Sequence, residues 1–155
     1  MAKITLAQAL KEKNRIAGQI RVLWDGIQQE NSRREDETRS IDVREALDTV
    51  ELYTGKLVEL KTKIGLANAG NLKHIYRMEE CKGKLAMLAG VNTDDSPLYL
   101  QVYSNTGKLI SRNVVISKKE IRDMQNRLQL ECNKLQDEMD AYNALTKIDF
   151  ETPLV

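Results

Sequence analysis

The feature that most constrains this chain is an apolar residue at every third or fourth position through a region that contains no proline. Only two prolines occur, and the first of them is Pro97. Such spacing places the apolar side chains along one face of an α-helix. It predicts one helix over about residues 5–31 and a second over about residues 42–64. The polar segment 31–40 between them is short, so we expect the two helices to fold back as an antiparallel pair.

Helix-start signals support this division and extend it along the chain. A Ser, Thr or Asp side chain at a helix N-terminus accepts a hydrogen bond from a backbone N–H, and a Glu or Gln three residues later completes the pattern. Such pairs stand at the start of three of the apolar-periodic segments, at Thr5 and Gln8, Asp42 and Glu45, and Ser117 and Glu120. Together with the apolar spacing, they predict two further helices, over about residues 71–89 and 117–147.

Between the third and fourth helices the periodicity changes to strict alternation, which is typical of a β-strand. The segment LYLQVY begins at residue 98, and SNTG then supplies a turn in which Gly107 can adopt a positive φ. We therefore predict a β-hairpin over about residues 98–116. After the last helix, residues 148–155 are expected to form an extended tail.

These elements predict an all-α fold, an antiparallel bundle of about four helices with a β-hairpin inserted before the last helix. Aromatic residues make up only 5% of the chain, so the core must be built from Leu, Ile, Val, Ala and Met. That composition suits helix-on-helix packing. A chain of 155 residues has the size of one ordinary domain, so we expect residues 1–155 to form a single helical-bundle domain.

Residues able to carry out catalysis are few and scattered. His74 is the only histidine, and it stands near Lys73 and Arg77 without a nucleophile and an acid beside it. Cys81 and Cys132 form no CxxC pair and share no zinc-ligand spacing with His74. The glycines form no phosphate-binding GxxxxGK[ST] loop. The sequence therefore predicts no catalytic, cofactor-binding or metal-ligating residue, no cofactor, and a protein that is not an enzyme.

Net charge and hydropathy indicate which partners and which compartment the chain is suited to. The formal net charge is +1, and the basic clusters SRRE and SKKEIR contain acidic residues and no aromatic ones, which argues against nucleic acid. No run of about 18 apolar residues suggests a membrane span, and the first fourteen residues lack the apolar core of a secretory signal. Two unpaired thiols are typical of a reducing compartment. We expect a cytoplasmic location or an intracellular assembly such as a virion.

Three short motifs add a resemblance to a known family. They are LAQALKEK in the first helix, KIGLANA in the middle of the chain, and LQDEMDAYNAL near the end of the last helix. With these motifs the chain resembles the septicolysin-like family of small bacterial proteins. Members of that family are helical and mostly lack an established function, so the resemblance implies a helical fold and no particular activity.

Two of these motifs share a pattern in which an apolar helix stripe ends in an asparagine. Leu60, Ile64 and Asn68 are spaced by four residues, as are Leu135, Met139 and Asn143. We expect both amides to lie near the ends of their helices and to be partly buried. There each amide can bond an exposed backbone carbonyl or the other amide, and so fix the register of the bundle.

The hairpin and the tail carry more apolar surface than one bundle can cover. Both faces of the predicted hairpin are partly apolar, so one face or one edge is expected to contact another chain. The predicted interface residues are Leu98, Leu100, Val102, Val114, Ile116, Phe150, Leu154 and Val155. They predict a structural or assembly protein that acts through protein–protein contacts, as a homo-oligomer or with an assembly partner.

Three alternatives remain open from the sequence alone. The hairpin could pack on its own bundle, with the tail covering the rest. The order helix, hairpin, helix is also that of a prefoldin-like chaperone or adaptor. The third alternative is an enzyme that uses the hairpin and nearby carboxylates on a ligand with no sequence signature.

Overall fold

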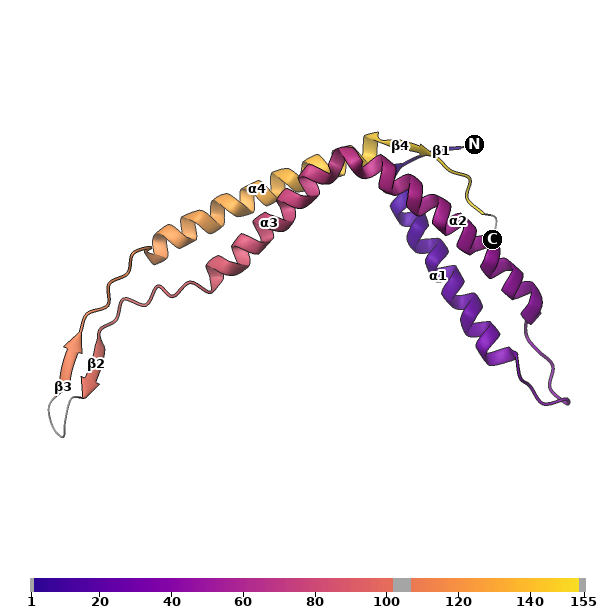
Figure 1. Cartoon of the computed structure of the whole chain (residues 1–155), viewed down its shortest axis with the longest axis horizontal. Coiled ribbons are helices and arrows are strands. Elements are labelled where there is room, and N and C mark those ends of the chain that lie inside the picture. Colours follow the sequence, from indigo (N-terminus) through magenta and orange to yellow (C-terminus); the bar gives the residue numbers. More distant parts are fainter. Residues whose placement is uncertain (1, 102–106, 154–155) are drawn as a thin grey trace. The chain divides into compact units, whose positions relative to one another are not determined.

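The computed structural model describes residues 2–101 and 107–153 and is mostly helical, which confirms the predicted helical class (Figure 1). The four α-helices are α1 (Leu6–Glu30), α2 (Val43–Ala67), α3 (Leu72–Ala89) and α4 (Lys118–Leu145). A 3-10 turn over Asn68–Asn71 joins α2 to α3. The short strands are β1 (Lys3–Thr5), β2 (Leu98–Gln101), β3 (Gly107–Ile110) and β4 (Lys147–Asp149).

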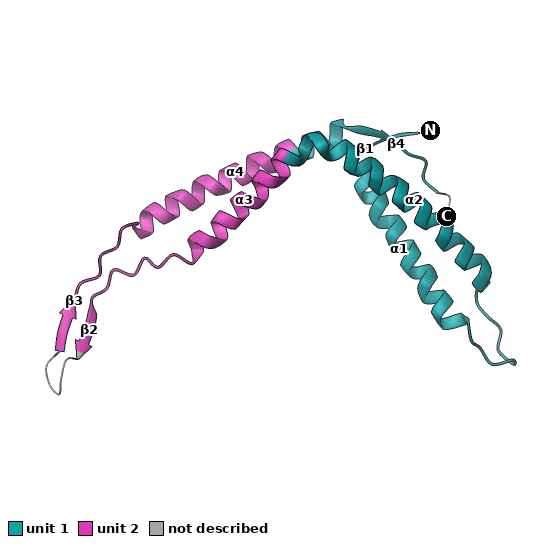
Figure 2. Cartoon of the chain, in the orientation of Figure 1, with its two compact units in different colours: residues 1–72, 139–155 teal, residues 73–138 magenta. Residues whose placement is uncertain are grey.

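The chain divides into two compact units (Figure 2). Unit 1 contains residues 1–72 and 139–155, and unit 2 contains residues 73–138. In unit 1 helices α1 and α2 pack side by side. In unit 2 helices α3 and α4 run side by side (Figure 2), and side-chain contacts of Arg77 with Glu131 and of His74 with Glu138 join them. The packing of all four helices into one bundle and one domain stays a prediction.

The predicted helix-start signals operate at three of the helix N-termini. Thr5 and Gln8 form a complete capping box at the start of α1. Asp42 accepts a hydrogen bond from the backbone N–H of Glu45, 3.1 Å from N to Oδ1, at the start of α2. Ser117 does the same at the start of α4. These short-range bonds fix where the helices begin, because each satisfies a backbone N–H that has no partner inside the helix.

A small sheet made from the two ends of the chain completes the core of unit 1. Strands β1 and β4 pair antiparallel, with Ile4 opposite Ile148. Below them the core of this unit is closed by residues from both helices and from the tail: Leu6, Ala9, Ile16, Tyr53, Leu60, Ile64, Ile148 and Phe150. The tail is thus extended as expected, but its first residues form a strand that the sequence analysis did not predict.

Phe150 differs from its predicted role. It was expected to contact another chain, yet it is only 1% exposed and lies in the core of unit 1. The ammonium of Lys56 lies 5.9 Å from the centre of its ring, and Lys63 Nζ donates a hydrogen bond of 2.6 Å to the carbonyl of Asp149. Burial of an aromatic ring of this size stabilises the unit, so the ring is not available to a partner.

The segments KIGLANA and LQDEMDAYNAL meet inside unit 1. Tyr142 Oη donates a hydrogen bond of 2.7 Å to the carbonyl oxygen of Ala67, the last residue of α2. Gly70 leaves room for that ring, because a Cβ at this position would lie 2.7 Å from Tyr142 Oη. The end of α4 is therefore attached to the end of α2 by the residue next to Asn143.

Unit 2 is held by a narrow apolar interface between α3 and α4. Its buried residues are Met78, Cys81, Ile121, Cys132 and Leu135. Two polar contacts flank this interface: Arg77 Nε donates to Glu131 at 2.6 Å, and His74 Nε2 lies 3.2 Å from Glu138 Oε2. These cross-helix contacts fix the register of the two helices.

Candidate assembly surface

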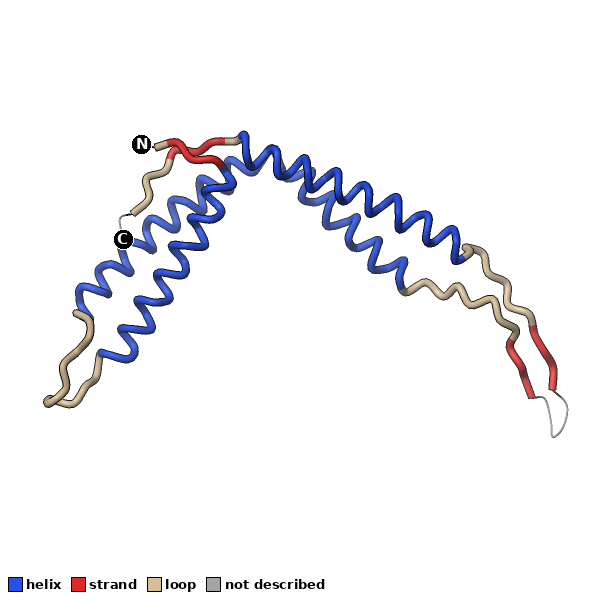
Figure 3. The backbone as a smooth tube through the Cα atoms, turned by 180° about the vertical axis from the view of Figure 1, so that it is seen from behind, coloured by secondary structure: helices blue, strands red, loops and turns tan. Residues whose placement is uncertain are grey.

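The strands β2 and β3 form a two-stranded antiparallel sheet directly before α4. Leu98 pairs with Ile110, Tyr99 with Leu109, and Leu100 with Lys108. The return strand was expected to extend to residue 116 but ends at Ile110. Pro97 precedes the first strand and has no N–H to donate, which favours an end of the ladder at the pair of Leu98 with Ile110. Figure 3 shows both strands beyond the ends of the helices of unit 2.

Neither face of this sheet is covered by another part of the described chain. Leu98, Leu100 and Ile110 share one face and are each between 40% and 43% exposed. Tyr99 and Leu109 share the opposite face and are 62% and 68% exposed. A lone hairpin is marginally stable in water at best. Large apolar side chains exposed on both of its faces are unusual, because exposed apolar patches commonly mark contact sites. We call this surface the hairpin surface.

Gly107 is needed for space rather than for backbone conformation. A Cβ at this position would lie 1.5 Å from Tyr99 Oη, so the tyrosine ring lies across the glycine. Gly107 can adopt a positive φ but does not do so here. An aromatic ring placed on a glycine of the neighbouring strand is a cross-strand contact that stabilises short hairpins.

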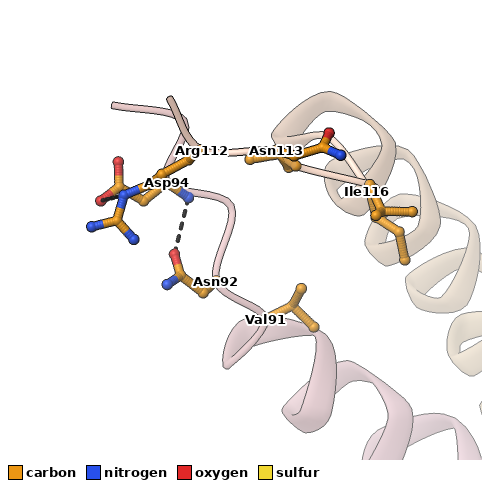
Figure 4. Close-up of a pocket in the computed structure, with 8 residues that line it drawn as sticks. Val91, Asn92, Asp94, Arg112, Asn113 and Ile116 are labelled. Carbon is orange, nitrogen blue, oxygen red and sulfur yellow. Dashed lines mark hydrogen bonds and ion pairs between the residues drawn. The ribbon is translucent and has the colours of Figure 1, made fainter. Parts of the chain in front are cut away.

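An open hollow of about 440 Å³ lies at the base of the hairpin, between the segments that join it to α3 and α4 (Figure 4). Val91 lines one side and Val114 and Ile116 the other. The predicted interface residues Val114 and Ile116 therefore lie in this hollow and not in a strand. The hollow therefore adds accessible apolar residues to unit 2, next to polar residues of the two joining segments.

Polar contacts organise the loop that forms one wall of the hollow. Asp94 Oδ1 accepts hydrogen bonds from the backbone N–H of Ser96 at 2.9 Å and from its hydroxyl at 2.5 Å, while the Asp94 N–H donates to Asn92 Oδ1. Arg112 Nε lies 3.9 Å from the other oxygen of Asp94. The Ser96 donors, with a smaller contribution from Arg112, hold the pKa of Asp94 below its usual value. The wall is thus a structured turn, of the kind in which Asx side chains bond their own backbone.

The remaining predicted interface residues are placed as follows. Leu98 and Leu100 lie in β2 on the hairpin surface, whereas Val102, Leu154 and Val155 lie outside the described residues. Tyr99, Leu109 and Ile110 also belong to the hairpin surface, although the sequence analysis did not select them as interface residues. Their position in an alternating segment was the signal that could have identified them.

Asn68 and Asn143 both lie near helix ends and are half-buried. Asn68 is the C-cap of α2, and its Oδ1 lies 3.5 Å from Asn71 Nδ2, a long contact. Asn143 Oδ1 is buried and has no hydrogen-bond partner within the described part of the chain. No hydrogen bond joins the two amides in that part, and Tyr142 makes the contact with a helix-end carbonyl that was expected of them.

The groups considered for catalysis are engaged in packing. Cys81 and Cys132 are both free and buried between α3 and α4, and burial raises the pKa of the Cys81 thiol. Glu131, close by, has its pKa lowered chiefly by the hydrogen bond from Arg77. Across residues 2–101 and 107–153, no cluster of three or more His, Cys, Asp or Glu side chains is arranged to hold a metal ion.

No helix in the described ranges combines the length and apolar character required to cross a bilayer. In comparisons with protein-family models, curated proteins and solved structures, nothing matches the chain.

Proposed function

We propose that this chain is a non-catalytic assembly protein that docks other protein chains through the hairpin surface of unit 2. The observation that carries the proposal is the exposure of Leu98, Tyr99, Leu100, Leu109 and Ile110 on both faces of an uncovered two-stranded sheet. Burying such side chains removes apolar area from water, at about 25 cal/mol per Å². A docked chain supplies that burial.

Backbone hydrogen bonding supports the same partner class. A two-stranded sheet has an unpaired edge on each strand, and an extended segment of another chain can add to either edge. The hollow lined by Val91, Val114 and Ile116 can take an apolar side chain of the same partner. A second copy of the chain is the simplest partner, because two hairpins can pair edge to edge in an isologous contact. The proposal therefore includes a homo-oligomer located in the cytoplasm or in an intracellular assembly.

Light scattering after size-exclusion chromatography tests the proposal on the full chain. We expect the wild type to have a mass of more than one chain at high concentration, and the Leu109→Lys variant to have a lower mass with unchanged helical circular dichroism. Leu130→Lys is the matched control, since Leu130 lies on α4 in the same unit and is also 68% exposed.

Two results would contradict the proposal. One is a wild type that stays monomeric at every concentration and captures no partner from its source. The other is a control variant that loses mass as much as Leu109→Lys does. A Leu98→Lys, Leu100→Lys variant then shows which face of the sheet is used, because it changes only the face opposite Leu109.

A prefoldin-like holdase is a second candidate, and one observation favours it. In unit 2 a pair of packed helices carries a β-hairpin with exposed apolar side chains at its end, a layout suited to contacting unfolded clients. Suppression of the aggregation of a heat-denatured enzyme by the wild type, but not by Leu109→Lys, would support it. An oligomer with no such effect would favour the assembly role.

Membership of the septicolysin-like family remains part of the proposal. Its support is that the second and third motifs meet in unit 1, where Tyr142 donates to the carbonyl of Ala67. The N–H of Leu6, which begins the first motif, donates at 2.7 Å to the carbonyl of Thr146, the residue directly after the third motif. The motifs thus carry the contacts that attach the end of α4 to α1 and α2. Purified relatives that share the three motifs should show the same strand pairing between their chain ends.

A further inference from the structure

A second candidate contact surface lies on unit 1, far from the hairpin in sequence. A groove of about 620 Å³ runs between α1 and α2, lined by Arg15, Gly18, Gln19, Val22, Leu23, Thr49 and Tyr53. Tyr53 is buried at its floor, while Val22 at its rim is 69% exposed. We call this the α1 groove. Most of its lining is apolar, and no described residue fills it.

Gly18 is the residue that opens the α1 groove. It lies in the middle of a 25-residue helix, where glycine disfavours the helix relative to alanine. A Cβ at this position would meet nothing within 4 Å, so no residue among 2–101 and 107–153 requires the glycine for close approach. The space at Gly18 is therefore open to a close approach by a neighbouring helix, since small residues bring helix axes nearer together.

The residues around Gly18 form a self-complementary face. At 100° per residue, Gly18 and Val22 lie about 40° apart around α1. Arg15 and Asp25 flank them, and all four residues fall within an arc of about 80°. The face thus holds a gap at Gly18, an exposed apolar knob at Val22, one positive group and one negative group.

We propose that α1 pairs antiparallel with α1 of a second copy of this chain, with Val22 of each copy seated over Gly18 of the other. Asp25 follows Val22 by three residues, and Arg15 precedes Gly18 by three. The same register therefore sets Asp25 of one copy opposite Arg15 of the other, twice by symmetry. Glu12 engages Nε and Nη2 of Arg15 and leaves Nη1 without a partner in the described chain, so Nη1 can reach Asp25 of the second copy.

The crossing angle follows from the same contacts. The charged pairs stand about five residues from the centre of the contact, or roughly 8 Å along the helix axis. A near-antiparallel crossing of about 20° keeps them within reach, as in helical bundles, whereas a crossing of about 50° separates them. This contact lies in unit 1 and is independent of the hairpin surface, so each can fail without the other.

Mixed disulfide formation tests both the partner and the register. Gly18→Cys and Val22→Cys variants, each also carrying Leu109→Lys to remove contact through the hairpin, are mixed under mild oxidation. We expect the cross-linked dimer of the mixture to exceed that of either variant alone. Wild type, whose two cysteines are buried, is the blank. Gly55→Cys mixed with Val58→Cys is the matched control, because these residues lie exposed on α2.

A second variant keeps the test independent of cross-linking. Gly18→Leu should weaken self-association about ten- to a hundredfold, because its side chain fills the space that Val22 of the partner needs. Leucine favours the helix over glycine, so the thermal midpoint of the separated chain should not fall. The proposal is overturned if the Leu109→Lys chain is folded and monomeric, or if the mixed disulfide is no more abundant than in the α2 control.

Discussion

The β1–β4 sheet and the β2–β3 sheet each contain two short strands, yet one closes the core of its unit and the other is exposed on both faces. The strands of the first come from opposite ends of the chain, and those of the second are neighbours in sequence. Ile148 in the first sheet is buried, whereas Ile110 in the second is 40% exposed. In this molecule, the sheet whose strands are far apart in sequence is buried, and the sheet whose strands are neighbours in sequence is exposed.

The difference shows what each pair of strands needs in order to form. Closing a short turn requires little loss of chain entropy, so β2 and β3 can pair without support from a helix. Strands separated by most of the chain are brought together only when other contacts have already fixed the chain ends. In unit 1 those contacts come from the helices below the sheet and from Phe150. A sheet that forms without cover keeps its apolar faces available, which suits it to docking.

The largest expected effect comes from removing the aromatic ring of Phe150, which lies beneath the β1–β4 sheet. We call this sheet the covered sheet. Phe150→Ala should lower the free energy of unfolding by about 3–5 kcal/mol, the usual cost of deleting a fully buried phenylalanine side chain. Urea denaturation followed by circular dichroism measures it. Leu109→Ala on the exposed sheet is the control and should change the free energy of unfolding by no more than about 0.5 kcal/mol. Similar losses for the two variants would contradict the distinction between the sheets.

A smaller effect is expected at the contact that attaches the covered sheet to α2. Tyr142→Phe removes the hydroxyl that donates to the Ala67 carbonyl and should cost about 1 kcal/mol, with the ring packing retained. Tyr76→Phe makes the same chemical change on an exposed side chain of α3 and should have almost no effect. If both variants unfold at the same urea concentration as wild type, Tyr142 does not anchor the end of α4.

The helices could be predicted from the sequence because their signals are local. Apolar spacing of three and four residues, with the side-chain caps at Thr5, Asp42 and Ser117, identified where α1, α2 and α4 begin. Each signal depends on residues within one or two helical turns, so no knowledge of the tertiary structure was needed. The alternation in LYLQVY located β2 for the same reason.

The covered sheet could not be predicted in this way. The segments KIT and KID that form β1 and β4 are three residues long, too short to show a strand period, and each pairs with a segment at the other end of the chain. The burial of Phe150 follows from that pairing, which is why this one residue lies in the core and not on the contact surface predicted for it. Residue spacing indicates the face of a helix, but not which of two neighbouring side chains reaches a carbonyl. The sequence therefore indicated Asn143, and not Tyr142, as the residue that bonds a helix-end carbonyl.

The smallest predicted effect compares one carboxylate from each unit under acid conditions. In unit 1 the backbone N–H of Ser40 donates to Glu30 at 3.1 Å, and Arg33 also binds this carboxylate. In unit 2 Arg77 binds Glu131 across the α3–α4 interface. The hydrogen bond from Arg33 is the largest cause that lowers the pKa of Glu30, followed by that from Ser40, while Arg77 lowers the pKa of Glu131. Folding therefore favours the ionised form of both carboxylates.

A lowered pKa in the folded state fixes the direction of the pH dependence. The stabilisation is fully present above the carboxyl pKa of the unfolded chain, about 4.3 for Glu, and is lost as the pH falls through the lower folded-state value. The Ser40 amide resonance should therefore shift with a midpoint below pH 4.5, the unperturbed value for Glu30. Glu30→Gln should abolish that shift while leaving the titration of Glu131 unchanged, since the two carboxylates belong to different units. A Ser40 midpoint at or above 4.5 would show that Glu30 does not hold the loop between α1 and α2 in its ionised form.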